Sequence, residues 1–195
     1  YLGGERRLLS VLLLLGGVGI FVWSYGVLLP VFARDVLHGG ARTLGWLMSA
    51  TGVGALAGAL TLASLGDYPH KYLLQFVGLG VTTAGVLGFA ASRSLGLSVL
   101  LLAVAGWGTV AFMATANTLV QTTVADEVRG RVMGVWSLVF AGTMPLGSLL
   151  MGTMGEHWGA PAATAIGAVA GAVVAGAIAA AFAKAWRSQA TATPQ

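Results

Sequence analysis

The chain has 195 residues, of which 57% are hydrophobic and only 8% are charged, and its mean hydropathy is +0.87. This composition lies far from that of soluble domains and excludes a fold that exposes its surface to water alone. The net charge of +4 fits loops that face anionic membrane lipid better than a nucleic-acid-binding patch, and the lack of cysteine excludes disulfides and thiol chemistry.

Charged residues divide the sequence into six uncharged segments, each long enough to cross a membrane. A charge at mid-bilayer costs at least about 2.5 kcal/mol, and a transmembrane helix needs about 20 apolar residues. Membrane β-strands would show an alternation of period two, which the segments lack. We therefore predict an all-α integral membrane protein with six transmembrane helices at 8–33, 43–64, 72–92, 97–121, 132–154 and 160–183, flanked by residues 1–7 and 184–195 outside the membrane.

Polar side chains within the spans are uncharged and concentrate in four of them. Aromatic surface with a few hydrogen-bonding groups suits an amphipathic ligand. Tyr25 and Trp136 are alternatively packing or interface residues, and Asn117 alternatively pairs with a neighbouring helix. The candidates for a substrate cavity are Trp23 and Tyr25 in the first span, Ser49 and Thr51 in the second, Trp107 and Asn117 in the fourth, and Trp136 in the fifth.

Small residues four positions apart predict faces where helices approach closely. Gly54 and Gly58 form such a pair in the second span, and Gly167 and Gly171 form one in the sixth. The same pairs serve either static packing or an interface that rocks during transport, and both readings stay open. Pro145 lies inside the fifth span and predicts a kink.

Basic residues are divided unequally between the two ends of the predicted spans. This asymmetry predicts that both termini are cytoplasmic, because basic loops stay inside. The inner face would carry Arg6, Arg7, Lys71, Arg129, Arg131, Lys184 and Arg187, and the outer face Arg34, Arg42 and Arg93.

The sequence shows no constellation typical of an enzyme. His38, His70 and His157 fall in predicted loops, and no two of them have the spacing of zinc ligands. The serine hydrolase elbow and the Walker phosphate loop are both absent from the sequence. We therefore expect no enzyme activity, no metal and no cofactor. No span carries a charge near its centre, so a carboxylate for proton coupling would have to come from elsewhere.

Two segments resemble signature loops of the major facilitator superfamily. Residues 65–71, Leu-Gly-Asp-Tyr-Pro-His-Lys, are similar to its cytoplasmic loop Gly-x-Leu-Ala-Asp-Arg-x-Gly-Arg-Lys, with Ala63 in place of the first glycine. Residues 125–133, Ala-Asp-Glu-Val-Arg-Gly-Arg-Val-Met, resemble the Pro-Asp-Glu-x-Arg-Gly-Arg-Val-Met run after the tenth helix of exporters akin to the enterobactin and macrolide efflux proteins. Residues 29–37 and 145–152 look like the same subgroup, at similar spacing.

The resemblance implies one six-helix half of a twelve-helix fold. The chain would be the C-terminal half, with its first, second, fourth and fifth spans facing a central cavity and its third and sixth facing lipid. Because it begins at Tyr1 without Met, we expect a longer chain cut within the central linker. The N-terminal six-helix half of the same transporter, missing here, would then be its partner.

The implied function is export of an amphipathic small molecule, drug-like or siderophore-like, across the bacterial plasma (inner) membrane. Transport would proceed by alternating access and be driven by the proton motive force. Two alternatives remain, a half-size transporter that pairs with itself and a non-transporting membrane scaffold or assembly protein. The resemblance further implies salt bridges of a cytoplasmic gate, unless the charges only set topology, at Asp67, Lys71, Asp126, Glu127, Arg129 and Arg131.

Overall fold

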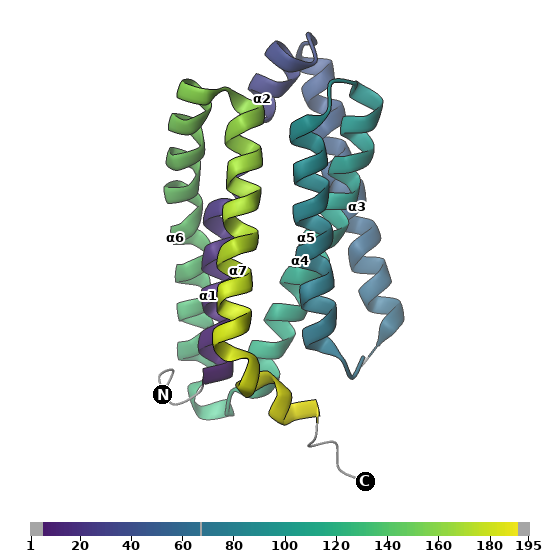
Figure 1. Ribbon diagram of the computed structural model, residues 1–195. Coiled ribbons are helices and arrows are strands. Elements are labelled where there is room, and N and C mark those ends of the chain that lie inside the picture. The colour runs from purple at the N-terminus through teal and green to yellow at the C-terminus, as the bar shows by residue number, and fades with distance from the viewer. Residues whose placement is uncertain (1–5, 67, 191–195) are drawn as a thin grey trace.

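The computed structural model describes residues 6–66 and 68–190, with side chains at 8–66 and 68–182. Six helical segments are long and apolar enough to cross a membrane, which confirms the predicted all-α bundle (Figure 1). The first segment is composite and the other five are single α-helices. In chain order the elements are α1 (Arg6–Phe21), the 3₁₀ helix η1 (Trp23–Leu28), α2 (Leu29–Val31), the π-helix η2 (Phe32–Val36), α3 (Ala41–Leu65), α4 (Lys71–Ala91), α5 (Leu95–Thr123), α6 (Asp126–Trp158) and α7 (Ala160–Ala190).

Pro30 explains why the first segment is not one regular α-helix. Proline has no N–H, so the carbonyl of Gly26 cannot receive its usual bond from four residues on. Instead, the Leu29 N–H donates to the Gly26 carbonyl with a 3₁₀ spacing. Farther along, the Leu37 N–H donates to the Phe32 carbonyl at 2.9 Å, which is a π-helical spacing. Trp23 and Tyr25, two of the residues expected to line a cavity, lie in the 3₁₀ part of this segment.

The six segments pack as two groups of three. One group is α3, α4 and α5, and the other is α1 with η1, α6 and α7 (Figure 1). The first segment of each half of the chain therefore packs against the second and third segments of the other half. Contacts of α4 with α7 and of α1 with α5 join the groups. This exchange is the pattern expected of two three-helix repeats related by a pseudo-two-fold axis.

Glycines permit the close contacts inside each group. A Cβ added to Gly78 of α4 would lie 2.6 Å from the backbone nitrogen of Phe112 in α5. Gly58 similarly meets the backbone of Trp107, so the predicted small-residue face of the second span packs on α5. A Cβ at Gly167 of α7 would lie 2.7 Å from the Phe21 carbonyl, so the sixth span approaches α1 equally closely.

The charged segment before the fifth span is helical rather than a loop. α6 begins at Asp126, and Ala125 before it is extended. Asp126 and Glu127 occupy the first turn, where carboxylates favour the positive end of the helix dipole. The same helix continues through Pro145 to Trp158, and His157, expected in a loop, lies in its last turn.

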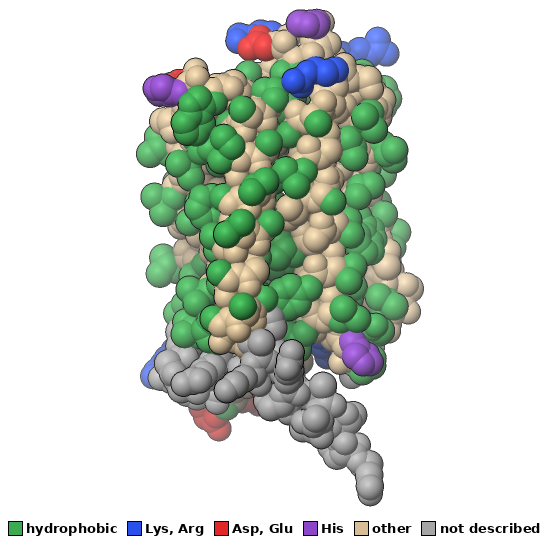
Figure 2. Space-filling model, in the orientation of Figure 1, with side chains coloured by type: hydrophobic (Ala, Val, Ile, Leu, Met, Phe, Trp, Pro, Cys, Tyr) green, Lys and Arg blue, Asp and Glu red, His purple; other side chains and the backbone are tan. Residues whose placement is uncertain are grey.

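The start of α1 and the end of α7 lie at the same end of the bundle (Figure 1). On the face shown in Figure 2, charged and histidine side chains gather at the two ends, and the band between them shows hydrophobic side chains and no charged ones. The resemblance implied that the third span faces lipid. α4 packs against both α5 and α7, and half (50%) of the residues in its most apolar stretch are buried. Its outer side still exposes Leu73 and Val77.

Candidate functional site

A cavity of about 440 Å³ lies between η1, α3, α5 and α6. These elements belong to the first, second, fourth and fifth spans, the same four that were expected to face a central cavity. α3 and α6 lie on either side of the cavity and scarcely contact each other among the described residues. The cavity therefore opens between them. The residues that line it are aromatic (Trp23, Tyr25 and Phe140), thioether-bearing (Met48, Met113 and Met144), hydroxyl-bearing (Thr51 and Thr109), and small or aliphatic (Gly26, Leu29, Gly52 and Ala55).

Aromatic contacts hold the Trp23 indole at the cavity wall. Its ring meets Phe112 edge-on at a centroid distance of 5.9 Å and Phe140 at 6.1 Å. Such edge-to-face pairs contribute about 0.5–1.5 kcal/mol each beyond burial of area. The indole Nε1 is buried and has no hydrogen-bond partner within the described part of the chain. Trp23 is therefore fixed in position while its one polar atom remains unsatisfied.

Tyr25 and Thr51 connect η1 to α3 beside the cavity. Tyr25 is 7% exposed, and its hydroxyl lies beside the side chain of Thr51. The Thr51 hydroxyl also donates to the Leu47 carbonyl at 3.2 Å. On α5, the Thr109 hydroxyl donates to the Ala105 carbonyl at 2.8 Å. The two threonine hydroxyls of the wall thus donate within their own helices, which leaves a weakly polar surface.

The wall of the cavity carries no Lys, Arg, Asp or Glu side chain among the described residues. Aromatic rings and flexible thioethers accommodate varied apolar shapes, and methionine sulfur makes favourable contacts with aromatic rings. The arrangement can hold the apolar part of an amphipathic molecule.

Residues missed by sequence reasoning include Met113, Phe140 and Met144. Their types are as common on lipid-facing surfaces as in cavities, so composition alone does not mark them. Met113 lies four residues after Thr109, and Met144 lies four after Phe140, so each pair shares one helix face toward the cavity.

Four predicted cavity residues lie outside this cavity. Ser49 is exposed on α3. Trp107 donates from Nε1 to the Thr61 hydroxyl at 3.2 Å, which binds α5 to α3. Asn117 accepts a hydrogen bond from Gln121 one turn along α5, so its amide is paired within its own helix. Trp136 is buried on α6, with 7% of its surface exposed.

The five described charges expected at a gate lie at the end of the bundle where α1 starts and α7 ends. Arg129 forms an ion pair with Asp126 within the first turn of α6 and also donates to the Val124 carbonyl at 3.5 Å. Glu127 and Arg131 are exposed on the same helix, and Lys71 begins α4. Asp67, the remaining gate candidate, lies outside the described residues.

Comparisons with known proteins agree on one family. Residues 6–194 match the model of the family described as transmembrane secretion effector, a branch of the major facilitator superfamily. The multidrug efflux pump Tap of Mycolicibacterium fortuitum is 30% identical over 144 residues, covering 72% of this chain and 34% of that protein. The enterobactin exporter EntS of Citrobacter koseri is 31% identical over 150 residues, covering 76% of this chain and 35% of that protein.

The enterobactin exporter EntS of Escherichia coli is similarly 31% identical, with 73% of this chain and 34% of that protein covered. The chain thus spans about a third of the length of these relatives. No solved structure matches significantly. The family match extends along nearly the whole sequence, and the structure adds six apolar helices with a cavity between four of them that no described charged side chain lines. The chain therefore belongs to the transmembrane secretion effector family of the major facilitator superfamily.

Proposed function

We propose that this chain forms the C-terminal six-helix half of a secondary transporter that exports an amphipathic small molecule. The observation that carries the proposal is the cavity between η1, α3, α5 and α6, which is apolar, free of charge and open on one side. Its volume of about 440 Å³ falls within the range of small-molecule sites, about 300–1,000 Å³. A second wall from a partner would complete the enclosure that a transported molecule needs.

The N-terminal six-helix half of the same transporter is the proposed partner. Lipid alone would cover apolar faces in a membrane, but a cavity that opens between α3 and α6 calls for a partner across it. Two facts support a missing half: the chain spans a third of its relatives' length, and large apolar side chains are exposed on both helices. These side chains are Met48, Val53, Leu56 and Leu60 on α3, and Leu138, Met144, Leu146 and Leu149 on α6.

The transport cycle would be alternating access, in which the two bundles rock around a site near mid-membrane. Two of the relatives are named as a multidrug efflux pump and an enterobactin exporter, which supports export of a drug-like or siderophore-like compound. The basic residues support a bacterial plasma membrane location with both termini cytoplasmic. Coupling to the proton motive force would use residues outside this half, since its cavity wall has no carboxylate among the described residues.

The charges of Lys71 and of the α6 start would form the gate at the cytoplasmic end. Asp126 and Arg129 pair in the first turn of α6, and Glu127 and Arg131 are exposed nearby. In one state of the cycle these charges would pair with the partner bundle, and in the other they would face water.

Filling the cavity tests the proposal. A Cβ at Gly52 meets no atom within 4 Å, so the backbone admits a side chain there, and Gly52→Leu would place that side chain in the cavity. Gly80→Leu on α4 is the matched control, because Gly80 is equally unobstructed and lies outside the cavity. Efflux of a fluorescent amphipathic dye from cells that make the full-length transporter should fall about tenfold for Gly52→Leu, which corresponds to about 1.4 kcal/mol. Gly80→Leu should leave efflux unchanged at equal expression, and equal efflux by both variants would refute the cavity assignment.

A further inference from the structure

One threonine of the cavity wall is paired with a second, buried threonine on the neighbouring helix. Thr109 of α5 lines the cavity of about 440 Å³, whereas Thr82 of α4 lies outside that cavity and is 1% exposed. Their hydroxyl oxygens are 3.5 Å apart. Both hydroxyls are also within hydrogen-bond distance of the Ala105 carbonyl, at 2.8 Å from Thr109 and 3.3 Å from Thr82. One carbonyl of α5 therefore has two hydroxyl donors, and only one of them belongs to the wall.

Close packing of α4 and α5 fixes Thr82 in this position. A Cβ added to Gly108 of α5 would lie 2.7 Å from the Thr82 hydroxyl oxygen. The same oxygen also lies 2.9 Å from the Gly78 carbonyl of its own helix. A hydroxyl has one proton, so Thr82 donates to either carbonyl. Changing from one acceptor to the other requires rotation of the O–H bond only, and no heavy atom has to move.

The Thr109 hydroxyl can leave the Ala105 carbonyl without leaving it short of a side-chain donor. Threonine in a helix populates two χ1 rotamers, one of which bonds a carbonyl of the preceding turn. The structure shows the bonded rotamer. Rotation about the Cα–Cβ bond would move the methyl group to the place of the hydroxyl and turn the hydroxyl away from Ala105. The Thr82 hydroxyl could then donate to Ala105 instead.

We propose that Thr109 determines specificity in the transport cavity by donating its hydroxyl to an acceptor oxygen of the transported molecule. Thr82 is a positioning residue, which takes over the bond to Ala105 when Thr109 turns. The inference rests on the proposed function and narrows its substrate class to amphipathic molecules with a carbonyl, ester or ether oxygen in the apolar part. A molecule without such an oxygen would leave Thr109 on Ala105 and gain no hydrogen bond.

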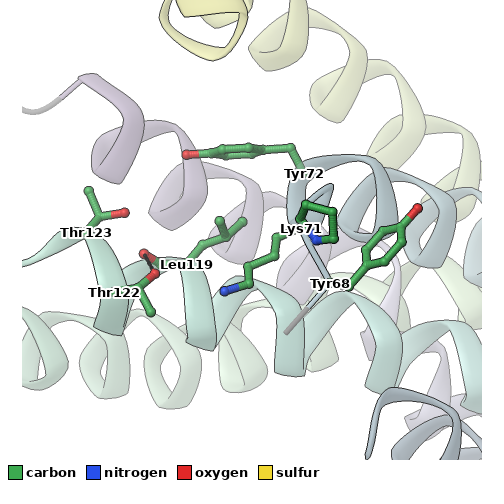
Figure 3. Close-up of a pocket in the computed structure, with 7 residues that line it drawn as sticks. Tyr68, Lys71, Tyr72, Leu119, Thr122 and Thr123 are labelled. Atoms are coloured by element: carbon green, nitrogen blue, oxygen red, sulfur yellow. Dashed lines mark hydrogen bonds between the residues drawn. The ribbon is translucent and has the colours of Figure 1, made fainter. Parts of the chain in front are cut away.

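Other threonines beside these helices lack a second donor. Thr51, the other hydroxyl of the wall, donates to the Leu47 carbonyl at 3.2 Å. Figure 3 shows Thr122 at a separate pocket of about 500 Å³, between the start of α4 and the end of α5. Its hydroxyl donates to the Thr118 carbonyl at 2.9 Å. Neither carbonyl receives a bond from a second hydroxyl among the described residues, so the exchange of donors is particular to Thr109.

Transport kinetics of two lipophilic cations, measured on the full-length transporter in proteoliposomes, test the inference. Rhodamine 123 carries an ester carbonyl, whereas tetraphenylphosphonium has no hydrogen-bond acceptor. Thr109→Val should raise the ratio of the rhodamine 123 KM to the tetraphenylphosphonium KM about fivefold, through loss of one hydrogen bond. Thr109→Ser keeps the hydroxyl and should restore the ratio. Thr82→Val should raise it about threefold, but should add nothing to Thr109→Val, because the two residues act through one bond.

Thr83→Val is the matched control. Thr83 is the next residue of α4 and is also buried, but it lines a groove against α7 and its hydroxyl has no partner among the described residues. Its replacement should leave both KM values unchanged. An equal rise of both KM values in Thr82→Val would show that Thr82 serves helix packing only and would overturn its positioning role. An unchanged KM ratio in Thr109→Val would overturn the assignment of Thr109.

Gly52→Leu separates this inference from the proposed function. If Gly52→Leu reduces transport of both cations while Thr109→Val leaves the KM ratio unchanged, the cavity stands and the inference about Thr109 fails. If the unaltered protein transports neither cation, or if Gly52→Leu transports both as well as the unaltered protein does, the proposed function fails and the inference fails with it.

Discussion

The α4–α5 contact and the outer faces of α3 and α6 use glycine in opposite ways. At the contact, Gly78 and Gly108 leave room for the backbone of the neighbouring helix, and a Cβ at either position would lie 2.6 Å from a backbone atom. On the faces, Gly52 of α3 and Gly142 of α6 meet no atom within 4 Å. Gly78 and Gly108 thus allow two helix backbones to pack directly against each other. Gly52 and Gly142 instead leave a surface without side-chain bulk next to the cavity. Composition alone does not separate these roles.

The largest effect should come from the closed contact. Gly78→Ala would force α4 and α5 apart, because a methyl group there collides with backbone and not with a flexible side chain. We expect a loss of about 1–3 kcal/mol in the free energy of unfolding, as for other overpacked cores. Gly80→Ala, two residues away and unobstructed, should change it by less than about 0.5 kcal/mol. Unfolding by denaturing detergent, followed by circular dichroism, measures both, and equal stability of the two variants would contradict the packing argument.

An intermediate effect should distinguish a face covered by protein from one covered by lipid. The chain has no cysteine, so single cysteines at Leu56 of α3 and Val77 of α4 can carry nitroxide labels. Both positions are exposed in this half, at 62% and 43%. In the full-length transporter the label at 56 should collide less with oxygen dissolved in the lipid, because the partner bundle would cover it. Equal accessibility at the two positions, measured by electron paramagnetic resonance, would argue against a partner on α3.

The smallest effect should come from the ion pair at the start of α6. The side chain of Asp126 is 83% exposed and that of Arg129 is 43% exposed, so solvent screens their attraction. Asp126→Asn should lower stability by less than about 1 kcal/mol, through the pair and the helix dipole together. If the pair also serves a gate, the same variant should change the rate of dye efflux while stability stays nearly constant. An unchanged rate would leave these charges with a topological role only.

Much of the architecture could be predicted from the positions of charges. Arg, Lys, Asp and Glu are costly in hydrocarbon, so the gaps between them mark the six helices, and the small-residue pairs at Gly54 and Gly167 mark two close contacts. The start of α6 was harder to predict. A charged run such as 126–131 resembles a loop until the acidic residues of its first turn are seen to favour the helix dipole.

The membrane environment, the six transmembrane segments and the lack of formal charge at their centres follow from the amino-acid sequence alone, because they depend on transfer free energies summed along each segment. Which polar residues meet depends on how the helices pack. Trp23, Tyr25 and Thr51 converge on one cavity where η1, wound as a 3₁₀ helix, lies beside α3. Trp107 and Asn117 are as polar in the sequence, but each already has a partner, Thr61 and Gln121 respectively. Convergence depends on helix rotation and on local hydrogen bonding, which span composition does not specify.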